Sequence, residues 1–346
     1  MEKRKEGILS QYDKNKQLYL NFLKYFLNTI EGIVIEESIV LQSIESRVKT
    51  RESLEKKIEL KEKYRSIEEI TDICGIRIIT YFSDDVDKIA NMIKRDFELD
   101  EINSVDKRET DDPTKFGYVS LHYIASLKAD RLRLSEAHRF KGLKIEIQIR
   151  TILQHAWAEI EHDMGYKAVG DIPIKVRRSF SRLAGVIELA DEEFVRIKDD
   201  LQDYSIKVQK EIKDNDESEI SIDLISIKAF VYSDGEYLQN VKESAKKASL
   251  PLLDISESKQ EQEIFSLIVK VCNKLDINNI SELKRIYFKY VKILEIIQLK
   301  EYEFITYVKT YVTTPLVKIL RVLDSAASTD INSDMFITLY EEIYLY

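Results

Sequence analysis

The chain has 346 residues, of which 44% are hydrophobic and 33% charged, a composition typical of a soluble globular protein of one or two domains. Its net charge of −9 argues against a generally cationic nucleic-acid-binding surface, although a local basic patch is compatible with it. The sequence shows no apolar run long enough to span a membrane and no signal-peptide core, and its two cysteines lack a metal-site spacing, so we expect a cytoplasmic protein without a membrane partner.

Helical and strand patterns alternate along the first 213 residues. Residues 8–66 have apolar positions at helical spacing, which predicts a largely helical N-terminal segment. The later patterns alternate between the two types, with strands at 73–82, 118–127 and 143–150 and helices at 85–96, 152–166 and 173–213. This alternation predicts an α/β domain built on one sheet. We therefore place a first domain at 1–213, a polar linker at 213–221 and a mostly helical second domain at 222–346.

The first candidate segment for chemistry is the basic stretch from Arg47 to Lys57, which precedes the first predicted strand. Its lysines and arginines could hold a triphosphate, and an arginine could stack on a nucleobase. The ordinary alternative is a solvated helix with Glu–Lys pairs at i,i+4 spacing, and the segment taken alone favours that alternative.

The second candidate is Asp72, which stands at the mouth of the strand predicted at 73–82. Hard cations such as Mg²⁺ prefer carboxylate oxygens, and a strand end is a usual place for such a ligand. Gly75 follows in the strand and could allow a close backbone approach. Asp72 could equally cap a helix or a turn.

The third candidate is the alternating set Tyr118, Ser120 and His122, which share one face of the strand predicted at 118–127. The tyrosine ring could stack on a base, with the serine and histidine beside it to contact sugar or phosphate. A half-buried antiparallel strand with a satisfied histidine is the more common reading of such a pattern.

The fourth candidate is the strand predicted at 143–150, where Glu146, Gln148 and Arg150 lie opposite three isoleucines. A carboxylate, an amide and a guanidinium in one row suit a metal ion and phosphate oxygens, whereas the alternative is an amphipathic strand with a solvated outer face. Asp72 and Glu146 belong to different strands and could converge on one Mg²⁺, because magnesium in phosphoryl-transfer sites is usually held by two carboxylates and substrate phosphates.

In this order the segments resemble the synthetase domain of the RelA/SpoT family, particularly its small alarmone synthetases, over about residues 40–200. The matching motifs are R-V-K…S…K, D-x-C/A-G-x-R, G-Y-x-S-x-H and E-I-Q-I-R-T…W…I-E-H…Y-K, carried here by Arg47, Lys49, Ser53 and Lys57; by Asp72, Gly75 and Arg77; by Gly117, Tyr118, Ser120 and His122; and by Glu146 through Lys167. The resemblance implies an α/β (α+β) fold with a nucleotidyltransferase-like mixed β-sheet flanked by helices. It also implies transfer of the β,γ-pyrophosphate of ATP to the ribose 3′-hydroxyl of GDP or GTP, which makes the alarmone (p)ppGpp.

The resemblance further implies roles for individual residues. Asp72 and Glu146 would be the catalytic carboxylates that ligate Mg²⁺, and Glu146 would orient or deprotonate the attacking hydroxyl. The residues implied for ATP are Arg47 and Arg77 on the adenine and Lys49, Ser53 and Lys57 on the phosphates. The residues implied for the acceptor are Lys115, Tyr118, His122, Gln148, Arg150 and His155, with Tyr118 stacked on the base.

The chain departs from the family pattern on the acceptor side. The family lysine usually lies four residues before the motif tyrosine, where this chain has Thr114, and Lys115 follows one position later. Phe116 stands where a small or polar residue is common. The acceptor therefore stays open, since toxin-type relatives pyrophosphorylate tRNA 3′ ends or use adenine nucleotides. The negative net charge argues modestly against tRNA.

Two further questions concern the role of the whole chain. A degenerate fold that senses nucleotides or scaffolds a partner is a non-enzymatic alternative, although both carboxylates and both arginines are present. No hydrolase motif accompanies the synthetase motifs, so we expect the protein to make its product and not to degrade it. Residues 222–346 could regulate the first domain, neutralise it or mediate homo-oligomerisation, and the apolar spacing in Leu283–Leu299 indicates the buried helical face of an ordinary core.

Overall fold

The computed structural model describes residues 2–61, 63–106, 120–167, 173–214, 216, 219–247, 252–253, 259–301, 310–311 and 313–344. The chain divides into two compact units, residues 1–198 and 199–346. The division falls within one helix, α5 (Ile174–Lys213), so the boundary that we predicted at Lys213 lies farther along that helix. Among the described residues, no helix combines the length and the apolarity needed to cross a membrane.

The first unit is a mixed sheet flanked by helices. Its elements in chain order are α1 (Glu2–Glu36), β1 (Leu41–Val48), α2 (Arg51–Leu60), β2 (Cys74–Thr80), α3 (Ser83–Asp96), β3 (Phe97–Leu99), β4 (Val105–Asp106), β5 (Leu121–Leu127), β6 (Ile145–Thr151), α4 (Ile152–Lys167) and the first part of α5. The strand order is β1-β2-β6-β5-β3, with β4 paired to β5. Among the described strands of this sheet, only β2 and β6 pair in parallel, and this confirms the mixed sheet that the resemblance implied.

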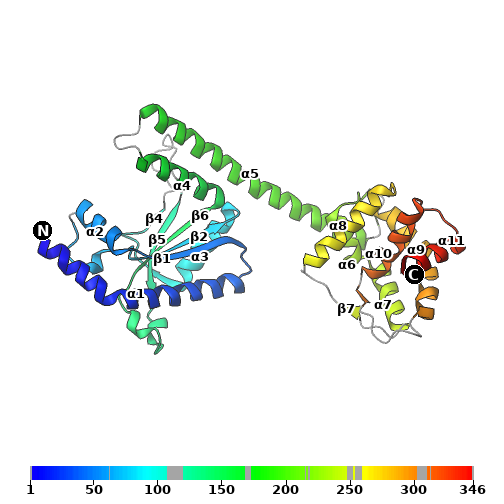
Figure 1. The fold of residues 1–346 in the computed structure, drawn as a ribbon, viewed down its shortest axis with the longest axis horizontal. Coiled ribbons are helices and arrows are strands. Elements are labelled where there is room, and N and C mark those ends of the chain that lie inside the picture. Colours follow the sequence, from blue (N-terminus) through cyan, green and yellow to red (C-terminus); the bar gives the residue numbers. More distant parts are fainter. Residues whose placement is uncertain are drawn as a thin grey trace. The chain divides into compact units, whose positions relative to one another are not determined.

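One face of the sheet is the hydrophobic core of this unit. Ile147 of β6 lies beside Ile76 of β2, and both are buried in one cluster with Phe22 and Phe26 of α1. Figure 1 shows α1 and α4 on opposite sides of the sheet. Because side chains alternate along a strand, burying the isoleucines on the α1 side leaves the polar residues of β2 and β6 on the other side.

The prediction that residues 8–66 are largely helical is wrong at β1. Ile44 and Val48 lie four positions apart, and this spacing fits one face of a strand as well as one face of a helix. In the structure both pack against the core from an edge strand, and the alternate residues Glu45 and Arg47 lie on the opposite face. The residues before and after β1 are helical, as α1 and α2.

The second unit is mostly helical, as predicted. It contains the end of α5, then α6 (Leu224–Ser233), α7 (Gly235–Lys247), α8 (Lys259–Lys274), α9 (Ile280–Glu301), α10 (Thr314–Ala326) and α11 (Ser333–Tyr344). Two short strands, β7 (Leu252–Leu253) and β8 (Thr310–Tyr311), pair in parallel. The apolar positions of α9 are buried in the core of this unit, which confirms the buried helical face predicted within Leu283–Leu299.

Both cysteines are buried, one in each unit. Cys74 begins β2 and Cys272 lies on α8, and neither side chain is accessible to solvent. Burial raises the pKa of each thiol to about 12. Both cysteines are therefore protonated core residues at neutral pH.

Candidate active site

Three neighbouring strands present their polar residues on one face of the sheet, in two rows. In the first row Arg47 of β1 pairs with Gly75 of β2, which pairs with Glu146 of β6. The second row lies two residues away along each strand. In it Glu45 is opposite Arg77, Arg77 is opposite Gln148, and Gln148 is opposite His122 of β5. Residues far apart in sequence therefore share one surface because of strand register alone.

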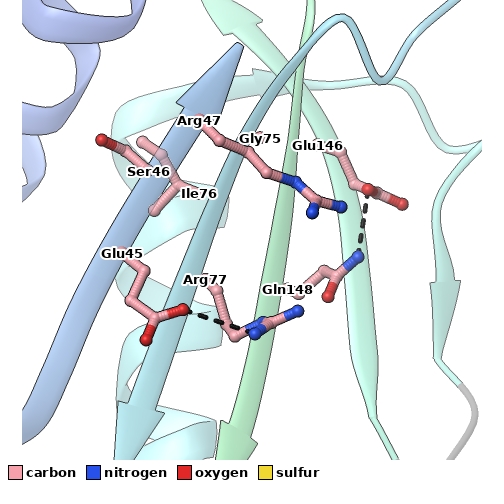
Figure 2. Close-up of a pocket in the computed structure, with 8 residues that line it drawn as sticks. All are labelled: Glu45, Ser46, Arg47, Gly75, Ile76, Arg77, Glu146 and Gln148. Atoms are coloured by element: carbon pink, nitrogen blue, oxygen red, sulfur yellow. Dashed lines mark hydrogen bonds and ion pairs between the residues drawn. The ribbon is translucent and has the colours of Figure 1, made fainter. Parts of the chain in front are cut away.

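A small pocket lies over the glycine in the first row. Its lining comes from β1, β2 and β6: Glu45, Ser46, Arg47, Gly75, Ile76, Arg77, Glu146 and Gln148. The cavity volume is about 140 Å³, and charged and polar side chains make up most of its lining. Figure 2 shows the Arg47 side chain passing over Gly75 toward Glu146, and the Arg77 side chain farther along the strand beside Gln148. A side chain at Gly75 would occupy this space, whereas two guanidinium planes can flank an aromatic base.

Asp72 lies just before β2 and is held by two lysines. Its Oδ2 is 2.5 Å from the Lys57 Nζ and 3.2 Å from the Lys49 Nζ. Burial opposes ionisation of this carboxyl, but the two ammonium groups outweigh burial and lower its pKa. Its other oxygen, Oδ1, is buried without a hydrogen-bond partner in the described part of the chain. Asp72 is therefore an ionised carboxylate with one oxygen available to a further ligand.

Glu146 is the second carboxylate of the site. Its Oε1 lies 3.4 Å from His122 Nδ1, and its Oε2 accepts a hydrogen bond from Gln148 Nε2 at 3.1 Å. Burial works against ionisation, yet the contact with His122 prevails and lowers the pKa of Glu146. The negative charge of Asp72 acts in the opposite direction, so the two carboxylates are close enough to repel each other. A cation between them would relieve that repulsion.

Gln148 connects Glu146 to a buried arginine. Its Oε1 accepts a hydrogen bond from Arg150 Nη2 at 2.5 Å while its amide nitrogen donates to Glu146. Arg150 is 4% exposed, so its charge lies inside the site and not on the surface. The row along β6 is therefore one chain of contacts that fixes the direction of each polar group.

The two lysines that contact Asp72 come from consecutive parts of the chain: Lys49 directly follows β1, and Lys57 lies on α2. The Lys49 N–H donates to the Ile73 carbonyl at 2.8 Å, which extends the β1–β2 pairing up to Asp72. Thr50 caps α2, because its side chain accepts from the Ser53 N–H at 3.2 Å. Ser53 thus lies at the N-terminus of α2, and its hydroxyl accepts from the Thr50 hydroxyl at 3.0 Å. Helix N-termini favour anions, so this placement suits phosphate oxygens.

The beginning of α4 adds residues from outside the sheet. A reciprocal cap starts the helix, because the Thr151 N–H donates to Gln154 Oε1 at 3.0 Å and the Gln154 N–H donates to Thr151 Oγ1 at 3.1 Å. His155 follows in the first turn, and burial, together with the charges of Arg77 and Arg150, lowers its pKa. His155 is therefore neutral at pH 7 and can both donate and accept a hydrogen bond.

Three residues of the site were not found by reading the sequence. Glu45 and Glu159 both contact Arg77, and Asp191 of α5 accepts a hydrogen bond from the Thr151 hydroxyl at 2.8 Å. Glu45 would have been found from its alternation with Arg47 if β1 had been recognised as a strand. Glu159 lies four positions after His155 on the same helix face, but no sequence signal marks Asp191.

Two of the predicted acceptor residues, Lys115 and Tyr118, lie outside the described residues. All the other predicted site residues are described, and most of them lie on or beside the polar sheet face. Among the described residues, no group of three or more His, Cys, Asp or Glu side chains forms a metal site by itself. The described set is a carboxylate pair with cationic neighbours, and this fits a cation that is shared with a phosphorylated ligand.

Comparison with known proteins agrees with this arrangement. The family described as "Region found in RelA / SpoT proteins" matches residues 46–171. The GTP pyrophosphokinase YwaC of Bacillus subtilis is 31% identical over 196 residues, which cover 54% of this chain and 90% of the relative. The GTP pyrophosphokinase YjbM of the same species is 30% identical over 154 residues, which cover 44% of this chain and 68% of the relative.

A similar solved structure is that of small alarmone synthetase 2 from Bacillus subtilis. It is 31% identical, with a TM-score of 0.46, and the match covers 55% of this chain and 99% of that one. From the identity and coverage of the sequence relatives, the chain belongs to the RelA/SpoT family.

Proposed function

We propose that the protein is an ATP-dependent pyrophosphokinase whose acceptor is GDP or GTP. In this reaction the ribose 3′-oxygen of the acceptor attacks the β-phosphorus of ATP. A new bond forms between that oxygen and the β-phosphorus, the bond between the β-phosphorus and the α,β-bridging oxygen breaks, and AMP leaves. The acceptor hydroxyl loses its proton, and the product carries a 3′-pyrophosphate.

The observation that carries the proposal is the pair Asp72 and Glu146, two ionised carboxylates set among cationic side chains on one sheet face. Transfer of phosphoryl-type groups depends mainly on positioning the two nucleotides and neutralising charge, and the described residues supply both. The names of the two relatives, both GTP pyrophosphokinases, support the same reaction class.

Each side of the site has a place in this proposal. Arg47 and Arg77 would flank the ATP base over Gly75, while Lys49, Ser53 and Lys57 would contact its phosphates. The two lysines now neutralise Asp72, so they would share their charge with the phosphates once ATP is bound. His122, Gln148, Arg150 and His155, together with Lys115 and Tyr118, would form the acceptor side.

The lowered pKa of Glu146 bears on its role. A carboxylate with a lowered pKa is a weak base that stays ionised at neutral pH, so it is better suited to orient the 3′-hydroxyl by accepting its hydrogen bond than to hold its proton. Activity should therefore fall at acidic pH as Glu146 and Asp72 become protonated. It should not fall as the pH rises through neutrality because of these two groups.

The residues also fit a Mg²⁺ ion. Asp72 has a buried Oδ1 without a hydrogen-bond partner in the described part of the chain, and Glu146 is held within repulsive range of it. Asp72 and Glu146 would hold the ion, which would supply neutralisation of the charge on the transferred phosphates. The protein residues would orient the two nucleotides around it.

The test is a transfer assay with purified protein, Mg²⁺ and ATP labelled at the γ-phosphate, offered GDP, GTP, adenine nucleotides or bulk tRNA in separate reactions. Label on GDP or GTP, lost in Glu146→Gln, supports the proposal. Label on tRNA or on an adenine nucleotide would show that the acceptor is not GDP or GTP, while the protein would still be a pyrophosphokinase. No transfer to any acceptor would contradict the proposal and favour a nucleotide-sensing module.

A further inference from the structure

One arginine of the site is held by carboxylates from two different elements. Arg77 Nη1 lies 3.3 Å from Glu45 Oε2 on β1 and 3.1 Å from Glu159 Oε1 on α4. Glu45 lines the pocket and Glu159 is not among the residues that line it. Figure 2 shows the Glu45 contact reaching Arg77 along the strand row, on the side away from Gln148. The side chain of Arg77 is 24% exposed, so these contacts largely determine where its charge lies.

The geometry of a guanidinium separates its edge from its faces. Its N–H donors lie in the plane of the group, so a carboxylate that accepts from them, as Glu45 does from Arg77 Nη1, occupies its edge. The flat faces of a guanidinium can stack on an aromatic ring. The Glu45 hydrogen bond and the Glu159 ion pair restrict Arg77, which lines the pocket, and a residue fixed before binding loses less conformational entropy on binding.

The cluster of residues around Arg77 and the cluster around Asp72 differ in net charge. The cluster of Glu45, Arg77 and Glu159 has one more carboxylate than cation, whereas the cluster of Lys49, Asp72 and Lys57 has one more cation than carboxylate. A triphosphate is attracted to the second cluster and repelled by the first. Arg77 is therefore kept from pairing with phosphates and left for an uncharged base.

Glu159 also links this arginine to the acceptor side. Glu159 Oε1 lies 3.8 Å from His155 Nδ1, one turn earlier on α4. The same carboxylate oxygen therefore approaches both the arginine proposed for the donor base and a histidine proposed for the acceptor. A displacement of α4 would change the position of Arg77 through this contact.

We propose that Glu159, acting with Glu45, is a positioning residue that holds Arg77 for the base of the donor adenine nucleotide. This inference rests on the proposed function, because it assumes that ATP occupies the pocket. Its effect is on binding of the donor, so the loss of Glu159 should raise the KM for ATP and leave kcat largely unchanged.

The test is a double-mutant cycle read by the Kd of α,β-methylene ATP, a donor analogue that cannot transfer pyrophosphate. The proteins are the full chain, Glu159→Gln, Glu45→Gln, Arg77→Met and the double variant Arg77→Met with Glu159→Gln. Each glutamine variant should weaken binding about 3- to 10-fold, in the lower part of the range for coupled neighbours because both carboxylates are half exposed. In the Arg77→Met background, Glu159→Gln should have no further effect.

A control removes the same charge elsewhere. Glu188 is exposed on α5, and Glu188→Gln should bind the analogue as the unchanged protein does. Wild-type affinity in Glu159→Gln, or an equal loss in both Arg77 backgrounds, would overturn the inference while the proposed function stands. If the unchanged protein does not bind the analogue with Mg²⁺ present, the proposed function itself is contradicted.

Discussion

Polar groups are buried in both units, but their partners differ. In the second unit Asp234 accepts from the Tyr237 N–H at 2.7 Å, which caps α7, and it also lies 2.7 Å from the Lys284 Nζ. The single proton of the Tyr290 hydroxyl is shared between the carbonyls of Thr329 and Ile331, and the hydroxyl oxygen accepts from the Ile331 N–H. In the first unit, Asp72 Oδ1 and His122 Nε2 are buried without a hydrogen-bond partner among the described residues, whereas Asp234 Oδ2, which also lacks a hydrogen bond there, has the Lys284 ammonium as its ion-pair partner.

This difference separates structural from functional polar groups. A buried polar atom without a partner lowers stability, so it is retained where a ligand completes its hydrogen bonds. A buried polar atom with all its partners stabilises the fold. Substitutions of the site residues in the first unit should therefore reduce activity more than stability, and substitution of Asp234 in the second unit should do the reverse.

The largest effect should come from Glu146→Gln, which keeps the shape of the side chain and removes its charge. We expect transfer activity to fall about 10²- to 10⁴-fold, because the 3′-hydroxyl loses its charged acceptor and the cation loses a ligand. The unfolding midpoint should stay near that of the unchanged protein. The same exchange at the exposed Glu98 of β3 should leave both quantities unchanged. Equal transfer activity in the Glu146→Gln and Glu98→Gln variants would show that Glu146 takes no part in the reaction.

The opposite result is expected for Asp234→Ala in the second unit. Lys284, whose side chain is 13% exposed, would lose its close partner Asp234 and keep the more distant Glu236 at 3.5 Å. We expect a loss of about 3 kcal/mol in the free energy of unfolding. Far-UV circular dichroism in denaturant measures this loss, while the fluorescence of Trp157, the single tryptophan, reports on the first unit. If Asp234→Ala lost transfer activity and kept its stability, Asp234 would be a functional residue and not a structural one.

A third variant, Gly75→Val, fills the pocket floor without disturbing the sheet. A Cβ at this position meets only the Glu146 carbonyl oxygen, at 3.9 Å, so the fold should accept it. We expect the KM for ATP to rise by up to about 10²-fold, because the base is displaced from between the arginines. Gly32→Val on the exposed face of α1, where a Cβ meets nothing within 4 Å, is the matched control. An unchanged KM for ATP in Gly75→Val would show that the donor base does not bind over Gly75.

A pH-dependent effect on stability concerns the buried Asp191, which is 3% exposed. Burial raises its pKa from 3.8 to about 6, although the hydrogen bond from Thr151 opposes the rise. Because the folded state holds this proton more tightly than the unfolded chain, stability should decrease as the pH rises from about 4 to 6 and then stay level. The loss is at most about 3 kcal/mol.

Asp191→Asn should remove this pH dependence and stabilise the first unit above pH 6. Trp157 fluorescence in denaturant at pH 4 and pH 7 measures both effects, since Trp157 Nε1 donates to the Phe180 carbonyl and so reports on the packing of α4 against α5. An identical pH profile in the two proteins would show that Asp191 ionises freely in the folded state.

The sequence was sufficient to predict β2, β5 and β6 and the family resemblance. Strand alternation places Glu146, Gln148 and Arg150 on one face, and the ordered motifs carry the resemblance. It could not identify β1, since Ile44 and Val48 fit helical and strand periods equally well. The register between β1 and β2, which brings Glu45 to Arg77, follows from pairing between distant segments and has no local signal. The contact between Glu159 and Arg77 likewise depends on how α4 packs on the sheet.

The burial of Cys74 and Cys272 has a practical consequence for work with the protein. Both are inaccessible and remain thiols at neutral pH, so maleimide reagents should not modify either one in the folded state. A cysteine introduced at an exposed position such as Ile102, which is 93% exposed, should therefore take up a single label in the otherwise native chain. Fluorophores or spin labels can thus be attached without first replacing Cys74, which adjoins Gly75 at the pocket floor.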